Sequence, residues 1–113
     1  MIRSTRVFVN IKATYTIKTS TYSCEVLDLS MEGLKIGTRQ ILEAGDLLKI
    51  TLDLESRTIM FFCVVKNKGE NSGEYGIRIE ELHPEDKIVL DDFLLKFMIR
   101  SNLDLTEEFK PNP

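Results

Sequence analysis

Six short segments rich in β-branched and aromatic residues constrain the fold of this chain more than any other feature. Stretches of turn-forming residues such as Gly, Ser, Asn and Asp separate them. The expected strands cover residues 7–17, 22–29, 34–36, 48–54, 58–66 and 75–79. Short consecutive strands without intervening helices favour antiparallel pairing over a parallel sheet with crossover helices. We therefore predict a mostly β fold, a six-stranded antiparallel β-barrel that is closed or nearly closed.

The C-terminal part of the chain has a helical pattern instead. Pro84 occupies a favourable first helical position, and Glu85 and Asp86 follow in the first turn, where the helix dipole favours acidic residues. Apolar residues then recur over 88–98 and form a wide face that must be covered. We predict one C-terminal α-helix over residues 84–102, packed against the barrel. A helix that binds a partner or a second copy of the chain is the alternative.

Length and composition fit a single ordinary domain. A chain of 113 residues with 42% hydrophobic residues can form one core without metal ions or disulfide bonds. We expect the domain to span residues 1–103, with a flexible N-terminal arm at 1–6 and a polar tail at 104–113. No apolar run approaches the roughly 20 residues of a transmembrane helix, and no apolar signal segment follows the N-terminal arginines. We therefore expect a cytoplasmic protein without membrane insertion.

The distribution of charge favours a small anionic ligand. The formal net charge of −3 argues against a surface built to hold nucleic acid. Residues 1–20 carry only basic charges, whereas residues 80–108 are strongly acidic. A local cationic segment on an acidic protein suits a small anion better than a long polyanion. A charge pattern that only solvates the surface is the alternative.

Residues suited to metal binding or catalysis are scarce. Cys24 and Cys63 lie far apart and no Cys/His cluster is present, so we expect two buried apolar side chains and no metal site. His83 is the single histidine, and beside Pro84 it is expected to help start the helix rather than to act as a general base. The sequence contains no phosphate-binding glycine-rich loop and no hydrolase motif. We therefore do not expect an enzyme.

The stretch Asp28-Leu29-Ser30-Met31-Glu32-Gly33 best fits a binding role, since it follows an expected strand and begins a tight turn. In an extended chain the side chains of Asp28 and Ser30 leave on the same side. A carboxylate and a hydroxyl so placed can accept hydrogen bonds from the N1 and N2 donors of guanine, while an arginine suits its O6 and N7 acceptors and the phosphates. Gly33 can adopt a positive φ and lets a ligand approach the backbone. The simpler alternative is that these residues only form the turn.

Taken in order, these features resemble the PilZ domain family. An arginine-bearing arm precedes the first strand, the D-x-S-x-x-G turn follows the second, and a strand-loop-strand pair over 64–79 leads to a helix that starts with Pro84-Glu85-Asp86. The resemblance covers almost the whole chain. It implies a PilZ-like split barrel of six strands with a helix, and a bacterial receptor for cyclic di-GMP.

The resemblance also implies a ligand site built from the arm and the turn. In the family, two arm arginines wrap the ligand while the turn contacts a guanine base. The implied cyclic di-GMP contacts in this sequence, with no metal, are Arg3, Arg6, Asp28, Ser30 and Gly33. Arg3 departs from the family pattern, because it precedes Arg6 by three positions where the family spacing is four. In an extended segment, residues three apart point to opposite sides.

The expected function is therefore that of a receptor or adaptor that binds cyclic di-GMP, changes the conformation of its arm and alters its contacts with a protein partner of unknown identity. A PilZ-like interaction module that binds no nucleotide is the alternative. The arginine spacing favours this alternative, and the intact turn motif opposes it. A barrel that binds nucleic acid is disfavoured by the negative charge and the absence of Trp.

Overall fold

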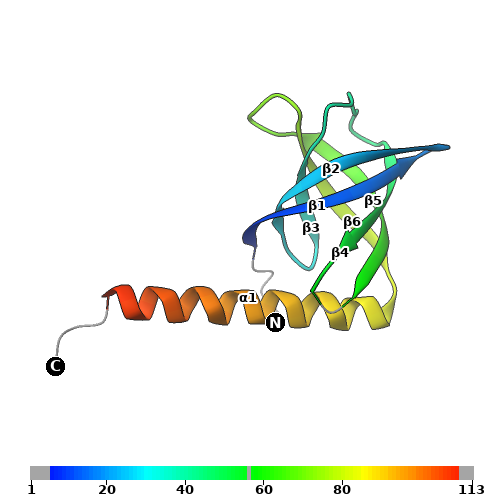
Figure 1. Cartoon of the computed structure of the whole chain (residues 1–113). Helices are drawn as coiled ribbons and strands as arrows, with labels where there is room; N and C mark the ends of the chain where they lie inside the picture. Colours follow the sequence, from blue (N-terminus) through cyan, green and yellow to red (C-terminus); the bar gives the residue numbers. More distant parts are fainter. Residues whose placement is uncertain (1–5, 56, 110–113) are drawn as a thin grey trace.

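The computed structural model describes the backbone of residues 6–55 and 57–109, and the side chains of these residues up to Ile99. Its elements are β1 (Val7–Ile17), β2 (Ser20–Leu29), β3 (Gly33–Gly37), β4 (Leu47–Asp53), β5 (Thr58–Lys68), β6 (Glu74–Leu82) and α1 (Pro84–Phe109). The strands form a closed barrel in the order β1-β2-β3-β6-β5-β4, and every pairing is antiparallel (Figure 1). The predicted fold class, six antiparallel strands in a barrel with one C-terminal helix, is confirmed.

Alternation of side chains along the strands fills the barrel. In β4, and in β5 as far as Val65, every second residue is buried, which is the two-residue period expected of strands with one face on a core. Tyr15, Ile50 and Phe61 are among the largest side chains that are almost completely enclosed. Cys24 and Cys63 are free and buried among them, as predicted. Burial raises the pKa of the Cys24 thiol to about 11 and that of the Cys63 thiol to about 12.

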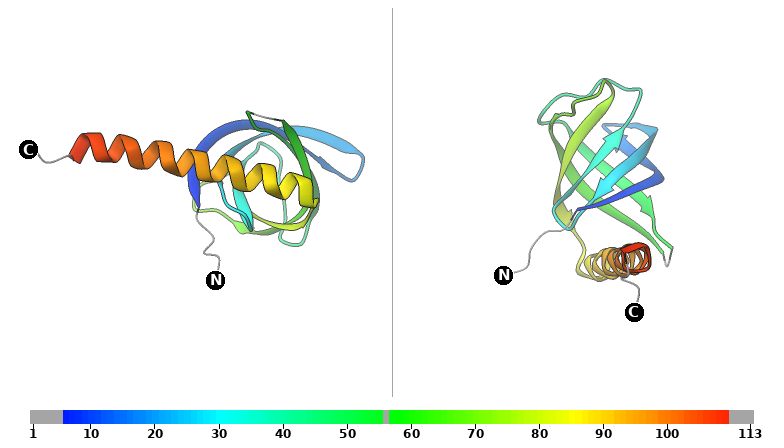
Figure 2. Two further views of the ribbon diagram at one scale, coloured as in Figure 1. Left: turned by 90° about the horizontal axis from the view of Figure 1, so that it is seen from below. Right: turned by 90° about the vertical axis from the view of Figure 1, so that its left-hand side faces the viewer.

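Helix α1 crosses one end of the barrel, as Figure 2 shows when the molecule is seen from below. Leu90 and Leu94 are buried and fix the first half of the helix to the barrel. His83 starts the helix as predicted: its carbonyl accepts a hydrogen bond from Lys87 N at 2.9 Å, and its Nδ1 accepts one from Glu85 N at 3.2 Å. These contacts satisfy backbone N–H groups that the first turn of a helix leaves free.

The helix continues past its predicted end. It runs to Phe109 rather than to residue 102, so residues 104–109 of the predicted polar tail are helical and project away from the barrel (Figure 1). The physical reason is that no Gly or Pro interrupts the sequence before Pro111. The arm at residues 1–5 and the segment 110–113 lie outside the described residues. In the part of the chain that is described, no helix is long and apolar enough to cross a membrane.

Candidate functional site

Asp28 lies on the outer wall of the barrel although its side chain is only 4% exposed. It is paired with Phe8 on β1 and with Lys35 on β3, and directly opposite residues in antiparallel strands share one face of the sheet. Their neighbours Leu29 and Leu34 are buried in the core, so the Asp28 row faces outward. A register shift between Val26 and Asp28 makes a bulge, a device that re-aims side chains beside binding sites.

Arg6, immediately before β1, covers this carboxylate. Its Nη1 lies 3.2 Å from Asp28 Oδ1 and donates a long hydrogen bond of 3.4 Å to Oδ2. Asp28 Oδ1 is close to the Arg6 guanidinium but accepts no well-directed hydrogen bond from any described residue. The Arg6 side chain is itself 52% exposed. Asp28 therefore retains acceptor capacity at a buried position, and the group that neutralises it can move.

Ser30 forms the turn that follows Asp28. Its hydroxyl donates to the Gly33 carbonyl at 3.1 Å and accepts from the backbone N–H groups of Gly33, at 3.1 Å, and Glu32, at 3.3 Å. Ser30 N also donates to the Gly33 carbonyl at 2.9 Å, which closes a tight connection between β2 and β3. The hydroxyl donor and its acceptor lone pairs are thus all used within the turn. Ser30 would therefore contribute to ligand binding by fixing the shape of the turn and not by direct contact.

Gly33 is required by the barrel itself. It is not among the described residues with positive φ, which are Lys18, Gly45 and Gly73, so the expected left-handed conformation is not found. A Cβ at Gly33 would instead collide with the carbonyl oxygen of Ile77 on β6. The turn is held against the same strand because Ile79 N donates a hydrogen bond to the Glu32 carbonyl at 2.8 Å. The glycine therefore allows β3 and β6 to approach closely.

The predicted site residues are thus only partly brought together. Arg6 and Asp28 are in contact, and Ser30 and Gly33 form the adjoining turn. Arg3 lies outside the described residues. No group of three or more potential metal ligands occurs among the described His, Cys, Asp and Glu residues.

Phe8 and Lys35 flank Asp28 in the strand register, and sequence reasoning did not identify them. A usable signal was present for Lys35. A turn closed between Ser30 and Gly33 places the residues two positions outside that pair, Asp28 and Lys35, opposite one another. Phe8 gave no such signal, because its partner depends on the irregular register of β1, which shifts between Phe8 and Ile11.

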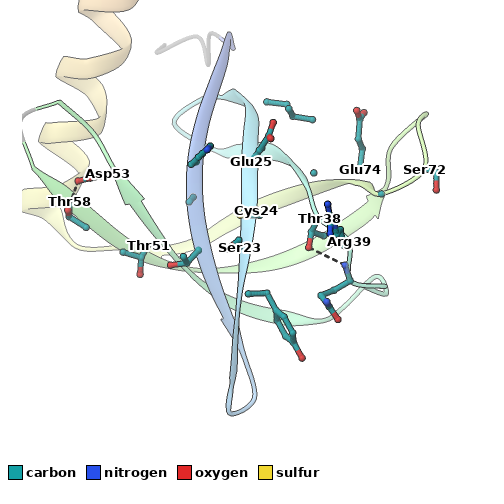
Figure 3. A pocket seen from close by; sticks show the side chains of 18 residues that line it. Ser23, Cys24, Glu25, Thr38, Arg39, Thr51, Asp53, Thr58, Ser72 and Glu74 are labelled. Carbon is teal, nitrogen blue, oxygen red and sulfur yellow. Dashed lines mark hydrogen bonds between the residues drawn. The ribbon is translucent and has the colours of Figure 1, made fainter.

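A cavity of about 1030 Å³ lies elsewhere and is not lined by the motif residues. It is a broad open groove along the outside of β1 and β2, bordered by the loops around Arg39 and Ser72, and its labelled side chains are spread out rather than converging on one point (Figure 3). Lys12 and Arg39 are outnumbered there by Glu25, Asp53 and Glu74, so the groove offers no net attraction to an anion. A smaller groove of about 440 Å³, lined by Phe8, Phe93 and Phe97 among others, lies between β1 and α1.

The fold and this site define a small antiparallel barrel with a helix across one end and a basic residue of the arm held against a carboxylate at the β2–β3 turn. The family model described as PilZ domain matches residues 2–96. The chain therefore belongs to the PilZ domain family.

Several solved structures share the fold at low sequence identity. The chain is similar to the PilZ domain with c-di-GMP of YcgR from Escherichia coli, with a TM-score of 0.70, 15% identity and coverage of 91% of this chain and 97% of that one. It is similar to the inhibitor of motility MotI/DgrA of Bacillus subtilis, with a TM-score of 0.70, 16% identity and coverage of 91% and 51%. For the K. pneumonia MrkH-c-di-GMP complex the TM-score is 0.68, the identity 18% and the coverage 92% and 55%.

The chain thus spans about half the length of MotI and MrkH and nearly all of the YcgR domain. A search of curated proteins gives no significant match. At these identities the structural similarity shows the shared fold alone.

Proposed function

We propose that this protein is a receptor for cyclic di-GMP. The observation that carries the proposal is the contact between Arg6 and Asp28, which the fold brings together from separate elements at the D-x-S-x-x-G turn. A carboxylate with spare acceptor capacity beside a mobile guanidinium matches the two kinds of group on a guanylate, the hydrogen-bond donors of its base and the negative charge of its phosphate. Two similar structures, of YcgR and MrkH, are described as containing c-di-GMP, which supports the same ligand here.

Each residue would have a separate role in binding. The Asp28 carboxylate would accept hydrogen bonds from N1–H and N2–H₂ of one guanine, a pairing of a charged acceptor with two parallel donors. Arg6 would leave the carboxylate and turn its guanidinium to a phosphate or to guanine O6 and N7. Ser30 and Gly33 would hold the turn in the shape that presents Asp28. Arg3, from the arm, would be a second and weaker cationic contact.

Binding would require the exchange of the Arg6–Asp28 pair for contacts with the ligand. Because Asp28 is buried, a carboxylate left without Arg6 would be costly, so the ligand's donors must take the place of the guanidinium. The new charged hydrogen bonds, roughly 1.5–3 kcal/mol each, would offset that cost. The release of Arg6 changes the conformation of the arm. The protein would thus act as a cytoplasmic receptor or adaptor, without catalysis, that transmits the presence of the nucleotide to a protein partner.

Calorimetric titration of the full chain with cyclic di-GMP tests the proposal, with GMP and cyclic di-AMP as controls. We expect saturable binding of cyclic di-GMP and much weaker binding of both controls. Adenine lacks the N1–H and N2–H₂ donors that Asp28 would bind, and GMP offers only one of the two guanylates. Absence of heat at ligand concentrations in the upper micromolar range, for a protein shown by circular dichroism to be folded, would reject the proposal.

A PilZ-like interaction module without nucleotide is the second candidate. The observation that favours it is the exposure of Ile88, Leu95 and Ile99 on α1, which leaves apolar side chains uncovered along a helix that extends past the barrel. A folded protein that binds none of the three nucleotides, and whose α1 substitutions abolish capture of a partner, would favour this candidate.

A further inference from the structure

We propose that Phe8 and Lys35 are ligand contacts on either side of Asp28, with Phe8 stacking on a guanine base and Lys35 binding a phosphate of the same nucleotide. This inference rests on the proposed function and completes its site. The three residues come from adjacent strands β1, β2 and β3, and the register pairs Phe8 with Asp28 and Asp28 with Lys35. Opposite residues in antiparallel strands have Cβ atoms roughly 4.5–5.5 Å apart, so the row presents an aromatic ring, a carboxylate and an ammonium group within the span of one nucleotide.

The Phe8 side chain is 79% exposed, and the next most exposed aromatic side chain among the described residues, Phe62, is 50% exposed. A single exposed aromatic residue needs no functional explanation by itself. The position of this one does carry an argument, because it lies across the strand pair from Asp28 and two positions after Arg6. A base whose edge is hydrogen-bonded to Asp28 would extend over the neighbouring strand, and the flat ring of Phe8 offers the stacking surface that flat bases bind.

Lys35 supplies a cation from a rigid element. It lies at the centre of β3 and is half-buried, so its stem is held while its ammonium group can reach the outer wall. None of the ion pairs found among the described side chains includes Lys35. The ligand carries two phosphates, whereas the spacing of Arg3 and Arg6 in an extended arm points them to opposite sides. Lys35 provides the second positive charge on the same side as Arg6, which contacts Asp28 on that wall.

Fluorescence tests the stacking contact, because the chain contains no Trp. The variant Phe8→Trp introduces a single reporter at the proposed stacking position. We expect cyclic di-GMP to quench its emission in a saturable manner, since a stacked guanine quenches an indole, with a Kd close to that of the unmodified protein. Phe62→Trp is the matched control: Phe62 is half-exposed on the outer wall of β5, on the opposite side of the barrel from β2. Its emission should not change.

Affinity measurements test both contacts. Phe8→Leu removes the ring but keeps an apolar side chain, and we expect it to weaken binding about tenfold, the scale of a lost base–aromatic stack. Lys35→Gln should weaken binding about tenfold at low salt and less at high salt, because screening reduces the contribution of an exposed charge. Lys49→Gln is its control, since Lys49 is equally half-buried but lies on β4. This control should bind as the unmodified chain does.

The outcomes separate this inference from the proposed function. If the unmodified chain binds cyclic di-GMP while Phe8→Trp shows no ligand-dependent change and both Phe8→Leu and Lys35→Gln bind normally, the inference is overturned and the receptor function stands. If the unmodified chain does not bind, both are overturned. Loss of binding in Lys35→Gln together with a large fall in its melting temperature, with Lys49→Gln unchanged, would show that Lys35 neutralises Asp28 in the fold and would reject its role as a phosphate contact.

Discussion

Arg6 and Asp28 lie 22 positions apart in the sequence, and the barrel brings Arg6 Nη1 to 3.2 Å from Asp28 Oδ1. The carboxylate is fixed in β2 and buried, whereas the guanidinium is half-exposed at the end of the arm. The partner that can move is therefore the cation. In the proposed function, a ligand that brings both hydrogen-bond donors and negative charge would replace Arg6 at Asp28 and bind Arg6 elsewhere, which would couple occupancy of the site to the position of the arm.

The first prediction concerns these two residues. Asp28→Ala should reduce the affinity for cyclic di-GMP by about 1–3 kcal/mol, because it removes a charged acceptor from the guanine edge. Arg6→Ala should also reduce affinity, and Arg6→Lys should restore part of it, since lysine keeps the charge but lacks the two-pronged donor geometry. Isothermal titration calorimetry measures the affinity and thermal unfolding checks the fold. Normal affinity in both Asp28→Ala and Arg6→Ala would contradict the assigned site.

A second prediction separates the turn from the ligand. Gly33→Ala should destabilise the barrel by about 1–3 kcal/mol, because the added Cβ collides with the Ile77 carbonyl and strands β3 and β6 must move apart. Gly37→Ala in the same strand is the control: its Cβ would meet only Leu27 Cδ1, at 3.7 Å, so its effect should stay within about 0.5 kcal/mol. Urea unfolding of both variants measures the difference. Equal stability of the two variants would show that close approach at Gly33 is not needed.

The third prediction concerns the buried thiols and pH. Burial raises the pKa of Cys24 to about 11 and that of Cys63 to about 12, from an ordinary value of 9.0. The folded state therefore keeps both thiols neutral while the unfolded state ionises near pH 9, so this contribution to stability is complete below pH 9.0 and is lost as the pH rises towards about 12. The free energy of unfolding should fall less steeply above pH 9.0 in Cys24→Ala/Cys63→Ala than in the unmodified chain. Identical slopes would be inconsistent with this assignment.

The fourth prediction concerns the arm. Arg3→Ala should weaken binding less than Arg6→Ala, because Arg6 borders β1 and is held at Asp28. Ile2→Arg restores the spacing of the family and should tighten binding, since residues four apart in an extended arm point to the same side. Both effects should shrink at high salt. Calorimetry at two salt concentrations measures both effects. If Arg3→Ala bound cyclic di-GMP more weakly than Arg6→Ala, the proposed order of the two arginines would be wrong.

The fold was largely predictable because its signals are local. The two-residue period and the turn residues located all six strands, and Pro84 with its two following acids located the start of α1. The end of α1 was placed too early at residue 102. The sequence there contains no stop signal before Pro111, and an amphipathic face alone does not determine where a helix ends.

The site was predictable only in part because it depends on irregular register. Sequence motifs indicated Arg6 and Asp28, but the shared direction expected for Asp28 and Ser30 assumed a regular strand. The bulge before Asp28 and the turn at Ser30 give the two side chains different roles, one with spare acceptor capacity and one engaged by the backbone. Phe8 and Lys35 reach the site through strand pairing, which a linear motif does not contain.

Amide proton–nitrogen correlation spectra of the full chain, recorded during titration with cyclic di-GMP, test the central claim most directly. The account predicts that the largest shift changes fall on residues 6–8 and on 28–35, where the arm, the turn and β3 meet. Residues around Phe62 on the opposite wall should change little. Shift changes concentrated instead around Arg39 and Glu74 in the large groove, with residues 28–35 unchanged at saturation, would contradict the account.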